Sequence, residues 1–201
     1  MNIPKTPGQI EYVNVIQSQK PIIIATGPAG SGKTMFACQF AAEQLKNKEC
    51  KRIVLTRPIV AADEDMGYLP GDMERKMDPW IRPMIDVFEM QLTRNQLERC
   101  VKVEPLGFMR GRTFNDSFII GDEMQNSTPN QMKMLLTRLG ENSKLIVMGD
   151  LKQSDLINKK NGLADLVHKL KDNEFKYVEH VMMNEDDILR HPAVAEILKI
   201  Y

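Results

Sequence analysis

The sequence predicts an α/β fold in which one parallel sheet carries helices on both faces, within a single domain over residues 1–201. Three observations lead to this prediction. Apolar runs alternate with helix-like segments along the chain, which is typical of a parallel sheet. Several runs are short and uninterruptedly apolar, as strands buried on both faces are. The length of 201 residues is that of one domain, and no linker, repeat or low-complexity stretch divides it.

Six apolar segments are expected to form the strands of this sheet. Each is short, and helix-like stretches lie between them. The segments are Ile22–Thr26, Arg52–Thr56, Val101–Pro105, Phe118–Gly121, Lys144–Met148 and Tyr177–Val181.

Capping residues predict where several helices begin and end. Asp78–Pro79 has the residue types of an N-cap and first turn, so a helix is expected to open there. Thr128–Pro129 predicts the start of another helix, which Gly140 would end. A last helix is expected from about Asp187, with Pro192 bending or delaying it.

Composition limits the classes of partner and compartment. Lys plus Arg and Asp plus Glu number 27 each, so the formal net charge is zero and any nucleic-acid site must be a local patch. No apolar run reaches the roughly 20 residues that cross a bilayer, and the first residues are polar, so neither a membrane span nor a signal peptide is expected. The three cysteines are scattered, without CxxC spacing, which is typical of reduced thiols in a cytoplasmic protein.

A glycine-rich segment, Gly27–Thr34 (GPAGSGKT), lies between the first strand and a helix expected over Thr34–Leu45. It fits G-x-x-x-x-G-K-[ST], and the strand before it and the helix after it argue against an accidental turn. In such a loop, backbone N–H groups and the helix N-terminus face phosphate oxygens. Lys33 would reach the β- and γ-phosphates, and the Thr34 hydroxyl would bind Mg²⁺. ATP and magnesium are therefore the predicted cofactors, with nucleotide contacts from Gly27, Pro28, Ala29, Gly30, Ser31, Gly32, Lys33, Thr34 and Met35.

Polar residues follow the fourth and fifth predicted strands. Asp122 and Glu123 directly follow the predicted strand Phe118–Gly121. Asp122 would hold Mg²⁺ directly or through water, and Glu123 would orient and deprotonate the attacking water. Alone, this pair is also compatible with an acidic turn, but the upstream phosphate-binding loop favours catalysis. After the next strand, Gln153 would sense the γ-phosphate or position water and Asp150 would organise the loop; solvated turn residues are the alternative.

Several motifs together resemble the PhoH-like ATPases, the phosphate-starvation-inducible family. They are TRP (Thr56–Pro58), GYLPGD (Gly67–Asp72), DPWIRPMID (Asp78–Asp86), MRGRTFNDSFI (Met109–Ile119), DEMQNSTPNQMKMLLTRLG (Asp122–Gly140), GDLKQSDL (Gly149–Leu156) and DDILRHPAV (Asp186–Val194).

This resemblance extends from Thr6 onward and implies a fold like the first RecA-type domain of superfamily-one helicases, without a second domain. It also implies ATP hydrolysis, a link to RNA and a ring-shaped homo-oligomer such as a hexamer. Two residues depart from the family pattern: Met124 stands where Ala is expected, and Gly121 where an aliphatic residue is usual. Both departures leave the reacting groups in place.

Two further residues are candidates at the edge of the site. Thr6–Gln9 resembles an adenine-reading glutamine motif, in which the Gln9 amide would bond the base; a helix-capping box is the alternative. Arg190 would brace the γ-phosphate during catalysis, in its own site or in that of a neighbouring subunit. A surface salt bridge is the alternative role for Arg190.

Three arginines are candidates for contacting single-stranded RNA or DNA. Arg57 follows the second strand, a position that faces nucleic acid in related helicases. Arg110 and Arg112 would grip phosphates or a neighbouring subunit. Arginines in loops are also commonly solvated, so the alternative is that these three arginines are exposed surface residues without a binding role.

Three functions compete at this point. The first is an ATP-driven motor or remodeller of nucleic acid, with RNA favoured over DNA, working as an oligomer. The second is a nucleotide-gated regulatory or assembly ATPase that moves no nucleic acid, which zero net charge favours. The third is a small-molecule kinase, against which Glu123 argues because a residue that activates water suits hydrolysis.

Overall fold

The computed structural model describes residues 3–58, 73–156, 160–171, 173–189 and 192–197. These residues form a six-stranded sheet in the order β3-β2-β4-β5-β1-β6, and every strand pair is parallel. The predicted α/β fold with a parallel sheet is confirmed. The strands are β1 (Ile22–Thr26), β2 (Arg52–Thr56), β3 (Val101–Val103), β4 (Ser117–Gly121), β5 (Lys144–Gly149) and β6 (Val178–Met182).

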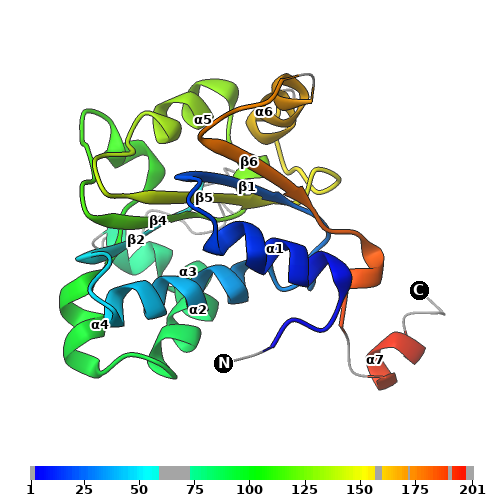
Figure 1. Ribbon diagram of the computed structural model, residues 1–201, viewed down its shortest axis with the longest axis horizontal. Helices are drawn as coiled ribbons and strands as arrows, with labels where there is room; N and C mark the ends of the chain where they lie inside the picture. The colour runs from blue at the N-terminus through cyan, green and yellow to red at the C-terminus, as the bar shows by residue number, and fades with distance from the viewer. Residues whose placement is uncertain (1–2, 59–72, 157–159, 172, 190–191, 198–201) are drawn as a thin grey trace.

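Helices cover both faces of the sheet, in two layers (Figure 1). Because consecutive strands are parallel, each connection must return along one face of the sheet. One face carries α1 (Pro7–Gln17), α2 (Lys33–Lys46), α3 (Met73–Glu89) and α4 (Arg94–Cys100), and the other carries α5 (Pro129–Leu136) and α6 (Gly162–Leu170).

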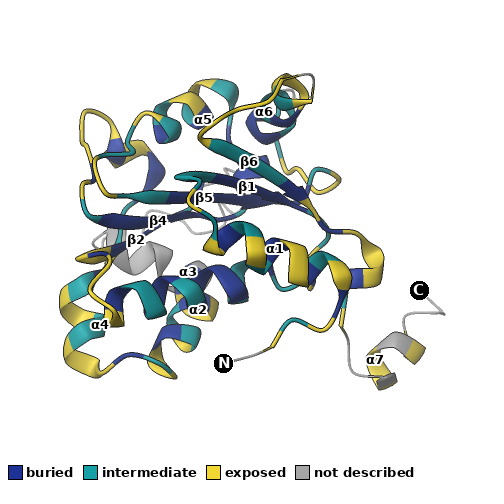
Figure 2. Ribbon diagram, viewed as in Figure 1, coloured by how far each residue is buried: buried dark blue, intermediate teal, exposed yellow. Residues whose placement is uncertain are grey.

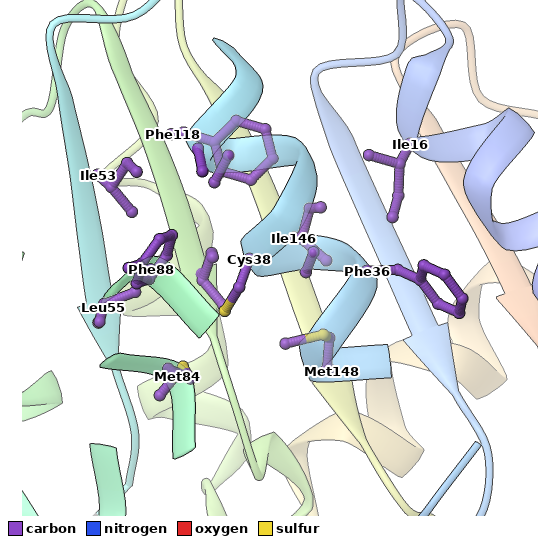
Figure 3. Packing of buried hydrophobic residues seen from close by; sticks show 14 of the residues in the cluster. Ile16, Phe36, Cys38, Ile53, Leu55, Met84, Phe88, Phe118, Ile146 and Met148 are labelled. Atoms are coloured by element: carbon purple, nitrogen blue, oxygen red, sulfur yellow. The ribbon is translucent and has the colours of Figure 1, made fainter. Parts of the chain in front are cut away.

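Each face has its own apolar core, because successive strand residues point to opposite faces. Ile53 and Leu55 of β2 pack in the cluster beneath α2, whereas Val54 between them packs in the cluster on the α5 side. Figure 3 shows Cys38 of α2 inserted among strand residues of the first cluster. The central strands are buried along almost their whole length (Figure 2), so the residues at their ends sit on a rigid base.

The boundaries of β3 and α5 differ from the prediction. β3 stops at Val103 because Pro105 begins a different element, the 3-10 helix η2 (Leu106–Met109). α5 begins after Thr128 as predicted, with a capping box to Gln131, but it ends at Leu136. Gly140 is not the helix stop: its N–H donates to the Phe114 carbonyl at 3.0 Å, and a Cβ there would lie 2.0 Å from an Asn115 oxygen.

The prediction that Asp78–Pro79 opens a helix is wrong. α3 begins at Met73, so this pair lies inside the helix. The upstream segment Met73–Met77 consists of good helix formers, which extend the helix ahead of Pro79. Near the C-terminus, the delay by Pro192 is confirmed, since the 3-10 helix η4 (Glu185–Asp187) precedes α7 (Pro192–Ile197).

Candidate nucleotide-binding site

Most of the predicted nucleotide, metal and catalytic residues converge at the C-terminal ends of β1, β4 and β5. Those that do so line a cleft of about 230 Å³. A larger hollow of about 610 Å³ beside β6 is lined by other residues, including Lys20 and His180, so size alone does not identify the site. The smaller cleft is lined by Ala29, Gly30, Gly32, Lys33, Thr34, Met35, Asp122, Glu123, Gly149, Asp150 and Gln153.

The glycine-rich loop has a backbone shape that side chains would prevent. Gly27 has a φ of 151°, and a Cβ there would lie 2.7 Å from the carbonyl oxygen of Met183. Gly32, with a φ of 93°, is the N-cap of α2, so the loop leads directly into the start of that helix. Unpaired N–H groups at a helix start and a curled loop together form an anion-binding cradle.

Lys33 is held inside this loop. Its side chain is 8% exposed, and Nζ donates to the carbonyls of Gly27 (2.7 Å) and Pro28 (2.8 Å) and to Ser31 Oγ (3.3 Å). Burial lowers the pKa of Lys33, while the nearby acidic side chains oppose that shift. The ammonium is thus pre-positioned at the loop, among oxygen acceptors, where a phosphate group would be held.

Asp122 and Thr34 meet across the cleft. Thr34 Oγ1 donates to Asp122 Oδ1 at 3.2 Å. Burial and the neighbouring Glu123 charge raise the pKa of Asp122 to about 6, although Arg57 and hydrogen bonds to Asp122 act in the opposite direction. This buried carboxylate is therefore under-compensated, which is the environment that a cation relieves.

These two residues fit a magnesium ion that is shared with phosphates. Mg²⁺ in phosphate sites is typically bound through one or two carboxylates together with substrate oxygens and water. Among the described residues, His, Cys, Asp and Glu form no cluster of three or more that would hold a metal by protein ligands alone. A hydroxyl and a carboxylate beside a phosphate-binding loop match the shared arrangement.

Glu123 has a strained backbone at the end of β4. Its φ of 51° and ψ of 35° are left-handed, and it is the N-cap of the 3-10 helix η3 (Met124–Asn126). Non-glycine residues in this region carry a conformational cost and cluster at functional sites. The strain turns the chain immediately after Asp122, so that adjacent residues both line the cleft.

Gln125 is a site residue that sequence reasoning missed. It is 2% exposed; its Nε2 donates to Glu123 Oε2 at 2.5 Å, and its Oε1 accepts from the Asp150 N–H at 3.2 Å. It therefore fixes Glu123 relative to the loop after β5. The only sequence signal was an amide side chain two positions beyond an acidic residue.

The loop after β5 carries Gln153 into the cleft, as predicted. Asp150 organises this loop, because its Oδ1 accepts from the Lys152 N–H at 2.9 Å and its carbonyl accepts from the Gln153 N–H at 3.2 Å. Asn126 and Asp155 exchange two hydrogen bonds of 2.9 Å. The loops bearing Glu123 and Gln153 are therefore joined.

Gln9 does not line this cleft. It is 3% exposed, its Oε1 accepts from the Lys5 N–H at 3.0 Å, and its Nε2 donates to the carbonyls of Ser31 (3.2 Å) and Asp187 (3.1 Å). Thr6 caps α1 by accepting from the Gln9 N–H, but the return bond goes to Lys5, so the capping box is only half formed. Arg190 lies outside the described residues.

The candidate nucleic-acid arginines lie in different settings. Arg57 is close enough to Asp122 for its charge to act on the pKa of that carboxyl. Arg112 forms an ion pair with Glu104 and lies over the Phe114 ring, 4.9 Å from its centroid. Arg110 is exposed in the turn after η2. The structure thus places only Arg57 beside the cleft.

The sheet, the loop and the carboxylates at the strand ends define a P-loop NTPase of RecA-like fold. Among solved structures, the chain is similar to a large terminase from a thermophilic bacteriophage (TM-score 0.60, 12% identity, 99% of this chain and 51% of that one). It is also similar to the Pif1 helicase of Candida albicans (TM-score 0.51, 15% identity, 100% and 43%).

The chain belongs to the PhoH-like protein family, whose model matches residues 2–201. It is 45% identical to a PhoH-like protein of Synechocystis over 98% of this chain and 61% of the relative. It is 43% identical to one of Bacillus subtilis, over 98% and 63%. Protein PhoH of Escherichia coli is 40% identical, over 99% and 58%. The chain therefore spans less than two thirds of the length of these relatives.

Within its described part, no helix is both long and apolar enough to cross a membrane.

Proposed function

We propose that this chain binds ATP with Mg²⁺ and hydrolyses it. One observation carries the proposal: Lys33, Thr34, Asp122 and Glu123 line a single cleft at the strand ends, with Thr34 hydrogen-bonded to Asp122. The alternatives of an accidental glycine turn and an unrelated acidic turn do not account for this convergence.

Each side chain has a distinct part in the proposed hydrolysis. Loop N–H groups and Lys33 bind the phosphates and stabilise the charge that develops on them. Thr34 and Asp122 would hold Mg²⁺, which neutralises phosphate charge when bound. Glu123 takes a proton from the attacking water, and its left-handed backbone and its bond to Gln125 hold it in place. Gln153 donates to the γ-phosphate or orients the water.

We further propose that hydrolysis is coupled to single-stranded nucleic acid, with RNA favoured over DNA, in a ring-shaped homo-oligomer. Arg57 supports the coupling, because its charge acts on Asp122. A nucleic-acid phosphate bound at Arg57 would weaken that effect and change the field at the metal carboxylate. The fold is also similar to part of the Pif1 helicase of Candida albicans.

A regulatory or assembly ATPase without nucleic-acid movement is the second candidate. Arg112 favours it, because that side chain is already engaged by Glu104 and by the Phe114 ring. The zero net charge of the chain points the same way. A small-molecule kinase is disfavoured, since Glu123, the proposed base for water, lines the cleft.

Phosphate release with and without RNA and DNA homopolymers, at several salt concentrations and alongside a solution mass, separates these functions. Stimulation by RNA of several-fold, with binding that weakens as salt rises, supports the coupling. Unstimulated hydrolysis with a nucleotide-dependent mass supports the regulatory candidate. Turnover that is equal in wild type and Lys33→Ala would overturn the site assignment.

A further inference from the structure

Unlike the buried aspartates Asp122 and Asp150, which line the cleft, the buried Asp187 lies outside it and has no part in the proposed chemistry. It ends η4, the segment that follows β6, and it is 2% exposed. A buried carboxylate is costly unless hydrogen bonds satisfy it, so its partners identify what it holds.

Two of those partners are at the start of α1, far away in the sequence. Thr6 Oγ1 donates to Asp187 Oδ1 at 2.6 Å, and the Gly8 N–H donates to the same oxygen at 3.1 Å. The Asn184 N–H donates to Oδ2 at 2.8 Å. A Cβ at residue 8 would lie 2.3 Å from Oδ2, so Gly8 gives the carboxylate its room. The carboxylate thus joins the α1 N-terminus, where negative charge is favourable, to the loop after β6.

The same junction continues into the phosphate-binding loop. Gln9 is the link, because its Nε2 donates both to the Asp187 carbonyl (3.1 Å) and to the Ser31 carbonyl (3.2 Å). The segment around Asp187 also packs on the loop directly: a Cβ at residue 30 would lie 3.4 Å from Ile188 Cγ2. Near the other end of the loop, the Met183 N–H donates to the Thr26 carbonyl at 2.8 Å.

We infer that Asp187 is a positioning residue for the phosphate-binding loop, acting through Gln9 and the segment Met183–Ile188. A curled loop binds phosphate tightly only if its N–H groups already face inward, because ordering it on binding would cost affinity. Asp187 supplies that order by fixing α1 and the segment after β6 against the outer side of the loop. The inference rests on the proposed nucleotide site, and it assigns to Gln9 a supporting role at Ser31.

The test compares Asp187→Asn with Asp186→Asn, a matched change at the exposed neighbouring residue. Asparagine keeps the shape but replaces one carboxylate oxygen by an NH2 group, which then faces a backbone donor, either Gly8 or Asn184. Affinity is measured with fluorescent ADP and Mg²⁺, and loop order with hydrogen exchange of the backbone amides of residues 29–32 in the nucleotide-free protein. We expect Asp187→Asn to bind about tenfold or more weakly, with kcat at saturation little changed and with faster loop exchange, while Asp186→Asn matches wild type.

Thr6→Val and Thr6→Ser keep the test decisive if Asp187→Asn fails to fold. Removing the Thr6 hydroxyl should weaken ADP binding and speed loop exchange, and serine should restore both. Wild-type affinity and exchange in a folded Asp187→Asn or Thr6→Val protein would overturn the inference while leaving the proposed function intact. If wild type itself binds no nucleotide, the proposed function fails, and the exchange measurement still decides whether Asp187 orders the loop.

Discussion

Two of the buried aspartates, Asp122 and Asp187, have opposite electrostatic environments. Asp122 is 8% exposed, and burial together with Glu123 raises its pKa to about 6. Asp187 is 2% exposed, and burial acts in the same direction there, but hydrogen bonds from Thr6, Asn184 and Gly8 outweigh it and lower the pKa.

This difference in pKa distinguishes Asp122, a candidate ligand-binding residue, from Asp187, a structural residue. Asp187 has a donor at each oxygen, so adding a cation there would gain little. Asp122 accepts hydrogen bonds from Thr34 and the Glu123 backbone and feels the charge of Arg57, but burial and the Glu123 carboxylate outweigh them. Part of its negative charge is therefore left for a ligand to neutralise. A protein keeps such an unfavourable arrangement where function requires it.

The largest effect is expected at Lys33. The substitution Lys33→Ala removes the ammonium group inside the loop. Hydrolysis should therefore fall below detection, and ATP should bind more weakly. Phosphate release and nucleotide titration measure this, with Lys46→Ala as a control because Lys46 is exposed at the end of α2. Turnover near that of the control would contradict the role of the loop.

Glu123→Gln should separate binding from chemistry. The amide keeps the size of the side chain but cannot accept a proton, so kcat should fall by roughly 10²-fold or more. The affinity for ATP should remain close to that of wild type, because Glu123 is not a phosphate ligand in this scheme. If affinity falls as much as kcat does, Glu123 is a metal or structural residue instead.

Gln125→Met should produce a smaller loss of the same kind. Methionine fills similar space but removes the bond to Glu123 and the acceptor for the Asp150 N–H. Because the base would be held less exactly in place, kcat should fall roughly tenfold at nearly constant KM. A change in KM alone would show that Gln125 shapes the nucleotide pocket and does not position the base.

The candidate cleft was largely predictable because its residues lie in short continuous segments of the sequence. Gly27–Thr34 is one continuous segment, and Asp122 and Glu123 directly follow a strand. Parallel strands bring their C-terminal ends to one edge, so finding the strands also placed these residues together. Gln125 was harder to predict, because its role depends on the approach of the loop after β5.

The support around Asp187 was not predictable, because its contacts join distant parts of the chain. Asp187 bonds Thr6 across 181 positions, and Gln9 bonds Asp187 across 178. Gly8 looks like an ordinary helix-start glycine until the carboxylate beside it is known. The same limit explains Gly140, which local rules assign to a helix end but which the approach of Phe114 and Asn115 requires.

The comparison of Asp122 with Asp187 can also be tested through the pH dependence of folding stability. The folded-state pKa of Asp122 is about 6 against an ordinary value of 3.8, so the folded protein binds the proton more tightly. Stability from this group is full below about pH 4 and is lost as pH rises through 6. Asp122→Asn never carries the charge, so above pH 6 the metal-free variant should be more stable than wild type by roughly 1–3 kcal/mol.

Asp187→Asn should show the opposite sign, because a lowered pKa contributes stability at neutral pH that is lost as pH falls. Urea unfolding of both variants and wild type between pH 4 and pH 8, with chelator present, measures the two differences. If Asp122→Asn is more stable than wild type and Asp187→Asn is less stable, the charge of Asp122 in the cleft lowers the free energy of unfolding, whereas that of Asp187 raises it. If both variants were destabilised equally at pH 7, the carboxylate of Asp122 would be as well satisfied as that of Asp187, and the contrast between site and support would fail.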